Sequence, residues 1–461
     1  MKRKIILLFF IAACAGLLSR NIGFNNHQVL ALSIFLMSIL GTLFFWSFRL
    51  AFVFLGSSVL LLTGTINFES LIKSASLDVI LFLMGMMVAM GLLKDAGLFA
   101  WIVSLMLRIK NLTANKFLIV ICFISALLSA VTSEVVSIIF VVAAILEICD
   151  YFEVDPVPFI IISVLATNIG SAATVLGNPI GILIATKAGL TFEDFILKAF
   201  PLSALCLISI IFLVKVWYHK TLIQLGEKIK EFGANEMLIK LISIPIEKQL
   251  KIALWIFGST LFFIAMHHRF ELLLNLEDNT ILLTMPLFSA GCILLWKWRK
   301  AREFIEKDVE WWTLLFFMLL FAQAGALSFT GATDVVAASF ARAAGHNQSG
   351  LIVLIISASA LGSSILDNVV LVTAFIPVIK SLKGVGFNLQ PFWWALLFGG
   401  CFGGNITLVG STANIVALGI LEKERNIKLS FFRWFWIGLT VGIISVVLAA
   451  FALIFLPLYH A

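Results

Sequence analysis

Long runs of apolar residues dominate this sequence. A helix needs roughly 20 apolar residues to cross the hydrocarbon core of a bilayer. Stretches that approach or reach that length occur at 5–19, 28–46, 50–66, 77–93, 195–217, 252–267, 279–296 and 430–458. Hydrophobic residues make up 61% of the chain and charged residues 12%, against roughly 45–50% and about 25% in soluble domains. The sequence therefore predicts an all-α polytopic membrane protein and excludes a water-soluble fold.

Basic residues occur in short clusters between the apolar stretches. The net charge of +7 therefore does not indicate a nucleic-acid partner, which would need a basic face. Cytoplasmic loops carry the excess of Lys and Arg in multi-pass proteins. Segments 215–251 and 297–307 are rich in these residues, whereas the loop 267–279 contains only Arg269. We expect both basic segments and the N-terminus in the cytoplasm, and the C-terminus outside.

The first residues also resemble an export signal. Met1 to Lys4 is basic and precedes an apolar run, and Ile11 to Cys14 resembles a lipoprotein cleavage box. Because many apolar stretches follow, we expect an uncleaved first helix. No metal site is expected, since the six cysteines occur singly, without CxxC spacing or neighbouring histidines. His267 and His268 should be solvated in the outer loop.

An internal repeat relates two parts of the chain at a shift of 233 residues. Leu118 to Val120 matches Leu351 to Val353, and Glu134 lies opposite Asp367 at the same shift. The glycines and threonine of one segment also recur in the other: Gly170, Thr174 and Gly177 match Gly403, Thr407 and Gly410. Under the predicted topology, 78–93 and its counterpart 310–327 cross the membrane in opposite directions. The repeats are therefore expected to be inverted, as in many transporters.

Each repeat contains a long interrupted apolar segment followed by a Gly-rich one. Segment 115–149 is too long for one span, and its polar interruption at 132–134 lies near the middle. We expect two short helices that form a re-entrant hairpin from the cytoplasm, and a partner hairpin at 349–383 from outside. The expected parts are N-terminal scaffold helices 1–70, a first inverted repeat 71–217 (hairpin 115–149, broken helix 158–186), a cytoplasmic linker 218–251, connecting scaffold helices 252–300, and a second inverted repeat 301–461 (hairpin 349–383, broken helix 391–421).

The Gly-rich segments predict a solute site. Irregular backbone at membrane depth is tolerated only where it is buried in protein or lines a watery cavity. A broken helix offers free N–H groups and a positive dipole end to an anion, and free carbonyls to a cation. Glycines could instead serve close helix packing, but the asparagines add polar groups that packing does not require. The candidate substrate-binding residues are Asn168, Gly170, Ser171, Thr174, Gly177, Asn178, Asn405, Thr407, Gly410, Ser411, Thr412 and Asn414.

The hairpin interruptions predict a site for a coupling ion near the bilayer midplane. A carboxyl group at membrane depth is protonated, paired or bound to a cation, because an isolated charge there costs several kcal/mol. A neutral acid that makes a structural hydrogen bond is the alternative. The candidate coupling-ion residues are Ser133, Glu134, Asp367 and Asn368.

At these residues the sequence resembles the ion transporter superfamily, in its arsenite permease and citrate transporter branches. The resemblance rests on segments 166–179, 366–369 and 403–410. It implies a homodimer and an elevator-type mechanism, in which a transport domain moves past a fixed scaffold. Sodium-coupled dicarboxylate members carry Ser-Asn-Thr at both hairpin tips, whereas this chain has Ser-Glu-Val and Leu-Asp-Asn there. The departure favours proton-linked branches, arsenite-permease-like exporters and sodium/proton antiporters among them.

The sequence thus predicts a secondary active transporter of a small anionic or oxyanionic solute, coupled to protons or sodium, in a bacterial-type inner membrane. No cofactor is expected beyond a sodium ion, and no nucleic acid. A sodium/proton antiporter is the closest alternative, and a passive channel stays open. An intramembrane enzyme is disfavoured because HExxH, GxSxG and GxGD patterns are missing from the sequence.

Overall fold

The computed structural model describes residues 2–45, 48–98, 101–102, 113–232, 247–345 and 347–460. Nine helices in this part of the chain are long and apolar enough to cross a membrane. Large apolar side chains are widely exposed in the described part of the chain, including Leu62 at 87% and Trp255 and Leu295 at 80% each. Such surfaces need lipid rather than water around them. The predicted all-helical, multi-pass membrane protein is confirmed.

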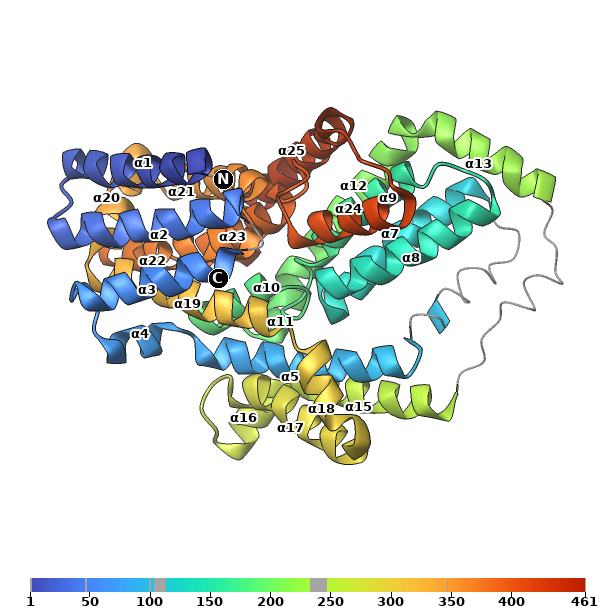
Figure 1. Cartoon of the computed structure of the whole chain (residues 1–461), viewed down its shortest axis with the longest axis horizontal. Helices are drawn as coiled ribbons and strands as arrows, with labels where there is room; N and C mark the ends of the chain where they lie inside the picture. The colour runs from blue at the N-terminus through green and yellow to red at the C-terminus, as the bar shows by residue number, and fades with distance from the viewer. Residues whose placement is uncertain are drawn as a thin grey trace.

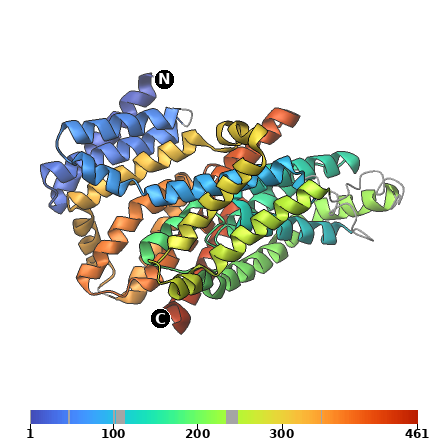
Figure 2. The ribbon, with the colours of Figure 1, turned by 90° about the horizontal axis from the view of Figure 1, so that it is seen from below.

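Three N-terminal helices pack in a layer at one end of the molecule (Figures 1 and 2). These are α1 (Lys2–Leu18), α2 (Asn26–Phe44) and α3 (Arg49–Leu62). A capping box starts α2, in which Asn25 and Gln28 exchange two side-chain to backbone hydrogen bonds of 2.9 Å each. Helix α19 (Trp311–Phe329) packs against α2 and α3. Gln323 on α19 donates a hydrogen bond to the carbonyl of Val53 at 2.9 Å, which ties these layers together.

A second group of helices surrounds α5 (Leu77–Asp95), which packs against α17 (Thr280–Trp296) and α15 (Lys248–Ala265). The contact is close at Gly85, where a Cβ atom would lie 2.6 Å from the backbone carbonyl carbon of Pro286. Short helices connect these spans: α4 (Phe68–Ser74), α16 (His267–Leu274) and α18 (Ala301–Glu303).

The first interrupted segment folds as α7 (Ala114–Thr132) and α8 (Glu134–Tyr151), with Ser133 alone between them. The Gly-rich segment that follows is helical in α9 (Val157–Gly170) and α10 (Pro179–Ala188) and non-helical between them. The chain continues through α11 (Phe192–Asp194), α12 (Phe200–Trp217) and α13 (His219–Phe232). Residues 233–246 of the predicted linker lie outside the described residues.

The same order recurs near the C-terminus. After α20 (Ala332–Ala343), the chain forms α21 (Gln348–Ile365) and α22 (Asn368–Leu382), then α23 (Gln390–Gly403) and α24 (Thr412–Arg425), and ends with α25 (Phe431–Phe455). Helix α21 packs on α23, as α7 packs on α9. The first two hairpin arms have 19 and 18 residues. They are longer than the short helices expected, because helix-compatible apolar residues run up to the break from both sides.

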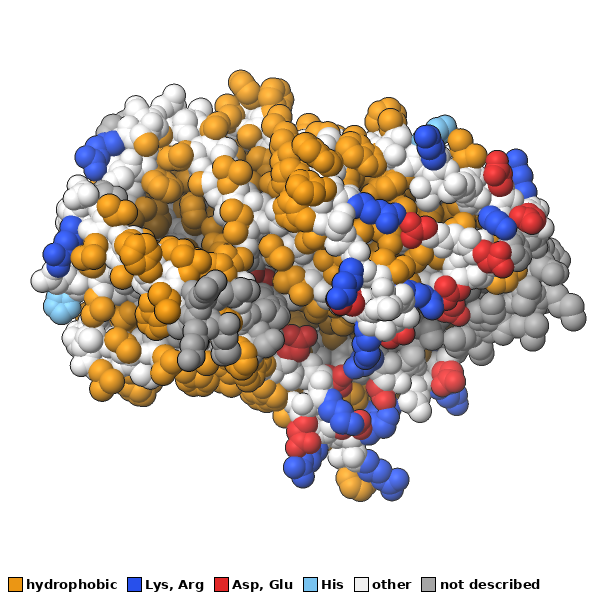
Figure 3. All heavy atoms as spheres, turned by 45° about the horizontal axis from the view of Figure 1, so that its top comes forward, with side chains coloured by type: hydrophobic (Ala, Val, Ile, Leu, Met, Phe, Trp, Pro, Cys, Tyr) orange, Lys and Arg blue, Asp and Glu red, His pale blue; other side chains and the backbone are white. Residues whose placement is uncertain are grey.

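Contacts also run between the two parts. Helix α8 packs on α24, and α10 packs on α22. In Figure 3, charged side chains gather in the right half and along the lower edge, while hydrophobic side chains cover much of the remaining face. Ion pairs of Arg433 with Asp155 at 2.8 Å and of Arg425 with Asp150 join the C-terminal part to the end of the first hairpin.

Candidate functional site

Four helix breaks come together in the interior of the molecule, between α7 and α8, α9 and α10, α21 and α22, and α23 and α24. Helices α10, α23 and α24 lie near the middle of the molecule in Figure 1. The backbone N–H of Glu134, at the first break, donates to the carbonyl of Gly177 in the second at 3.1 Å. Asp367, at the third break, accepts a hydrogen bond from Thr412 at the fourth. We call this region the break cluster.

In the first repeat, local geometry explains why the helices stop where they do. Ser133 has a φ of 117°, which is incompatible with a continuing α-helix and rare for a non-glycine residue. Gly177 lies so close to Ser171 that a Cβ atom would be 2.2 Å from the Ser171 carbonyl oxygen. Asn178 then caps α10, accepting from the N–H of Gly181 at 2.8 Å. Its amide also donates to the Ser171 hydroxyl at 2.9 Å, so one asparagine fixes both sides of the break.

In the second repeat, Asp367 connects the hairpin tip to the start of α24. Its Oδ1 accepts from the N–H of Val369 at 3.0 Å, and its Oδ2 accepts from the hydroxyl of Thr412 at 2.5 Å. Asn414 donates to the carbonyls of Gly404 and Thr407 at 2.8 Å each. These carbonyls belong to the non-helical stretch after α23. The asparagine thus satisfies hydrogen-bond acceptors that have no partner within the broken helix.

One buried polar network connects the two repeats. Asn168 donates to the side-chain oxygens of Asn405 at 2.8 Å and Asn414 at 2.9 Å, and accepts from the Ser411 hydroxyl at 3.0 Å. The exposed fractions of these four side chains are 0–1%. Residues 237 to 246 positions apart in the sequence thus form one hydrogen-bonded unit inside an apolar core.

Glu134 lies at the edge of this network. Its Oε1 accepts hydrogen bonds from Asn368 at 3.3 Å and from Ser411 at 3.5 Å. Its Oε2 is buried and has no hydrogen-bond partner among the described residues. The side chain is 2% exposed. A buried carboxylate oxygen without a donor is costly unless it carries a proton or meets a cation.

The packing corrects the expected pairing of Glu134 with Asp367. A Cβ on Gly170 would lie 2.2 Å from the carbonyl oxygen of Ala126, and a Cβ on Gly403 would lie 2.3 Å from that of Ala360. The equivalent hairpin residue is thus 234 positions away rather than 233. By that shift the counterpart of Glu134, the first residue of α8, is Asn368, the first residue of α22.

In this register, helix α21 ends one residue earlier than α7 does, at Ile365 rather than at Leu366, the counterpart of Thr132. Ser133 alone separates α7 from α8, whereas Leu366 and Asp367 separate α21 from α22. The shift of 234 also holds for two threonine hydroxyls. Thr174 donates to the carbonyl of Ala130, and Thr407 donates to that of Ser364. Gly170 and Gly403 allow the helices to pack closely. The two threonines satisfy carbonyls at the ends of α7 and α21. These four candidate substrate-binding residues therefore have a structural role.

Two residues that surround the break cluster are not among the predicted site residues. Trp434 on α25 is buried and donates its indole N–H to the carbonyl of Asn405 at 2.9 Å. Arg49 on α3 is 7% exposed, donates to the hydroxyl of Thr313 at 3.0 Å, and lies within electrostatic reach of Asp367. A lone arginine between the apolar stretches 28–46 and 50–66 could have been noticed as unusual.

A cavity of about 240 Å³ separates the second hairpin tip from the N-terminal layer. Thr42 on α2 lines one side, and Asp367, Val370 and Val409 line the other. Asp367 therefore faces space between the N-terminal helices and the break cluster, while Glu134 is enclosed within the cluster.

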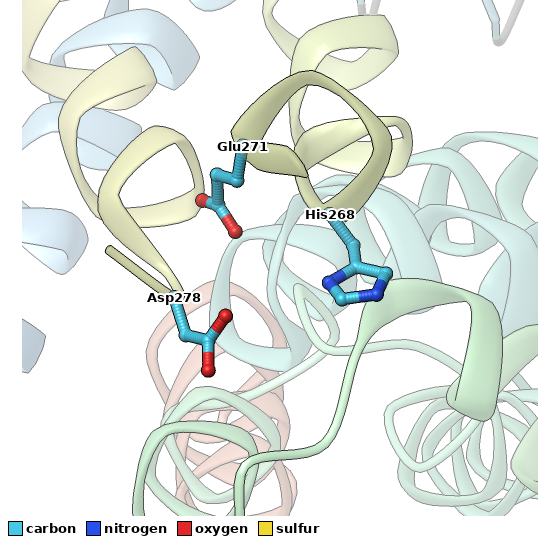
Figure 4. A group of neighbouring side chains, drawn as sticks. All are labelled: His268, Glu271 and Asp278. Atoms are coloured by element: carbon cyan, nitrogen blue, oxygen red, sulfur yellow. The ribbon is translucent and has the colours of Figure 1, made fainter. Parts of the chain in front are cut away.

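The segment 267–279 holds a group of side chains that resembles a metal site, shown in Figure 4. Ligand atoms of His268, Glu271 and Asp278 lie within 4.8 Å of one another. Both oxygens of Glu271 already accept backbone N–H groups, of Asn279 at 3.0 Å and Ile281 at 2.7 Å. Glu271 thus caps the start of α17. The expectation that His267 is solvated is wrong, because it is 1% exposed with its Nδ1 2.9 Å from the carbonyl of Ile264.

Comparison with known proteins agrees with this architecture. The family model described as citrate transporter matches residues 34–399. The chain belongs to the citrate transporter family. The matched region contains the first three helix breaks and ends before the fourth. The suspected superfamily is confirmed, and family membership indicates a transporter rather than an enzyme.

Several relatives of this citrate transporter family member carry transporter names. A protein described as an uncharacterized transporter of Mycobacterium bovis is 30% identical over 388 residues, which are 81% of this chain and 84% of that protein. The human P protein is 26% identical, over 80% of this chain and about half (52%) of its own length. Among solved structures, the YdaH transporter of Alcanivorax borkumensis aligns with a TM-score of 0.55 over 84% of this chain and 87% of that one, at 13% identity. This last likeness concerns the fold alone.

Proposed function

We propose that this chain is a secondary active transporter that couples movement of a small anionic or oxyanionic solute to protons or sodium ions. The observation that carries the proposal is the unpartnered, buried Oε2 of Glu134. An ionised carboxylate at membrane depth is costly unless it is paired. Glu134 is therefore suited to bind and release a cation, with Ser133, Asp367 and Asn368 as neighbouring oxygen donors.

The solute would bind beside this carboxyl group. Helix α10 starts at Pro179 and α24 at Thr412, and both N-terminal ends lie in the break cluster. A helix N-terminus carries a partial positive charge and exposed N–H groups, which favour anions. The buried amides of Asn168 and Asn414 add donors that can exchange their present partners for those of a solute. This combination supports an anionic or oxyanionic cargo of the citrate or arsenite permease type.

The movement proposed is of the elevator type. The hairpins and broken helices would form an inverted pair that moves as one domain past the N-terminal layer, with α19 and the cavity beside Asp367 at the sliding boundary. The matched packing of α7 on α9 and of α21 on α23 supports a pair of structural repeats. We further propose a homodimer in a bacterial inner membrane, with a cytoplasmic N-terminus.

A sodium/proton antiporter is the second candidate. The same unpartnered oxygen of Glu134 favours it, because carboxyl groups alone would then form the binding site. The buried Asn168, Asn405 and Asn414 would have a purely structural role in that case.

Ion flux in proteoliposomes tests the proposal. Purified protein would be reconstituted, and proton and sodium movement followed with a pH-sensitive dye and a sodium dye, with and without arsenite, citrate, succinate and sulfate. Proton or sodium movement that depends on one of these solutes is expected. Proton movement that depends on sodium alone would establish the antiporter. Proton or sodium movement that requires neither a solute nor a second ion would indicate a channel.

A further inference from the structure

A second, larger cavity lies away from the break cluster, among helices α4, α10, α19 and α22. Its volume is about 390 Å³, within the usual range of roughly 300–1,000 Å³ for ligand sites. Three lysines line it, Lys73, Lys187 and Lys380, and no Asp or Glu is among its lining residues. Five hydroxyl groups complete the polar lining, those of Ser70, Ser74, Ser76, Ser328 and Thr373.

The three lysines come from distant parts of the chain. Each lies in the last turn of its helix, on α4, α10 and α22. A lysine in a last turn complements the negative end of the helix dipole, which explains each lysine singly. It does not explain why three of them meet at one cavity. Lys187 and Lys380 are close enough for their positive charges to repel each other.

Acidic side chains do not neutralise this group. The ion pairs found in the described part of the chain involve none of the three lysines. Glu69 lies one helical turn before Lys73 and Asp78 lies at the start of α5, yet neither lines the cavity. An uncompensated cluster of ammonium groups attracts an anion, and each ammonium offers three donors to its oxygen atoms.

The backbone at the cavity wall is also unusual. Ser76 has a φ of 48° and is 5% exposed, in the left-handed region that a non-glycine side chain seldom adopts. It precedes α5, but its side chain does not cap that helix. On the opposite wall, Gly325 allows Ser74 to approach α19, because a Cβ there would lie 2.2 Å from the Cβ of Ser74.

We propose that this cavity binds a small, soluble, multivalent oxyanion at the outer mouth of the protein. Helices α4, α19 and α22 lie in the left half of Figure 1, and α13 of the predicted cytoplasmic linker lies at the right. Helices α10 and α22 both begin in the break cluster and end at the cavity. The cavity would supply solute to the cluster. That role rests on the proposed function, whereas anion binding in the cavity does not.

Equilibrium binding to the purified full-length protein in neutral-lipid nanodiscs tests this proposal. Sulfate and citrate would be titrated by calorimetry at constant ionic strength, with Lys73→Gln, Lys187→Gln, Lys380→Gln and the triple variant. Each single substitution should weaken binding about tenfold, the usual effect of losing one charged hydrogen bond. Lys251→Gln, an exposed lysine outside the cavity with the same charge change, should have no effect, and Lys380→Arg should retain binding.

Unchanged affinity in the triple variant would overturn the proposal. So would lysine-dependent retention of phosphatidylglycerol without any binding of sulfate or citrate, since the phosphate of a lipid headgroup has the same chemistry. Glu134→Gln separates the two ideas, because it should stop coupled transport and leave anion binding in this cavity intact. If the wild type binds sulfate and citrate through the lysines but transports neither, the supply role of the cavity fails and the anion site stands. If it transports none of the four solutes tested above, the proposed function fails while the anion site still stands.

Discussion

The two hairpin tips are alike in packing and different in chemistry. Each tip lies against a Gly-rich break, and in each repeat a glycine brings the two backbones into contact, Gly170 at Ala126 and Gly403 at Ala360. The first link has one residue and places Glu134 at the start of α8. The second has two residues and places Asp367 before the start of α22. The enclosed carboxyl group of the first tip, Glu134, therefore has an amide, Asn368, as its counterpart in the second tip.

This difference gives the two acids different surroundings. Glu134 is enclosed by Asn368 and Ser411 and has a free oxygen, whereas Asp367 uses both oxygens in hydrogen bonds and lines the cavity beside α2. We infer that the repeated fold supplies the framework, and that the residue at the start of the second hairpin helix, Glu134 in one repeat and Asn368 in the other, places the enclosed carboxyl group in the first repeat.

The largest expected effect is on transport in Glu134→Gln. Ion-driven accumulation of radiolabelled solute in proteoliposomes should fall to the level of protein-free liposomes, because glutamine cannot exchange a proton or bind a cation by charge. Solute exchange without an ion gradient should persist, since glutamine resembles the protonated acid in size. Glu147→Gln on the same helix removes an exposed carboxyl group and should transport normally. Equal losses in the two variants would contradict the assignment.

A smaller effect is expected from the two packing glycines. Gly170→Ala and Gly403→Ala should each destabilise the protein by about 1–3 kcal/mol, because a methyl group is forced against backbone in a packed core. Thermal unfolding of the purified protein measures this change. Gly258→Ala and Gly291→Ala, where nothing lies within 4 Å of the added Cβ, should be neutral or stabilising by roughly 0.5–1 kcal/mol. A large loss in only one of the two repeats would break the symmetry of packing that we describe.

The smallest effect concerns the bond between Thr412 and Asp367. Thr412→Val should cost about 0.5–1.5 kcal/mol of stability, the usual net value of one hydrogen bond. Thr412→Ser retains the hydroxyl and serves as the matched control in the same melting experiment. If the serine and valine variants melt alike, the bond does not hold the second tip in place.

Much of this arrangement could be predicted from the sequence. Gly, Asn and acidic residues stand out in apolar segments, so the breaks near Glu134, Asn178 and Asp367 were found from composition and repeat spacing. The register of the second hairpin is not predicted, because an ungapped comparison applies one shift of 233, whereas the hairpin residues are offset by 234 and the Gly-rich breaks by 233. The contact of Trp434 with Asn405 and the meeting of Lys73, Lys187 and Lys380 depend on packing between remote helices, which a single sequence does not encode in any local pattern.

The most direct test of the central claim, that Glu134 couples ion movement to solute movement, is the pH change that a solute gradient alone produces. Proteoliposomes would be loaded with the solute identified above, diluted into solute-free buffer at the same pH, and followed with an internal pH-sensitive dye. The account predicts a pH change with the wild type and none with Glu134→Gln, provided that protons are the coupling ion; with sodium, a sodium-sensitive dye gives the equivalent result. The same ion movement in Glu134→Gln as in the wild type would contradict the account.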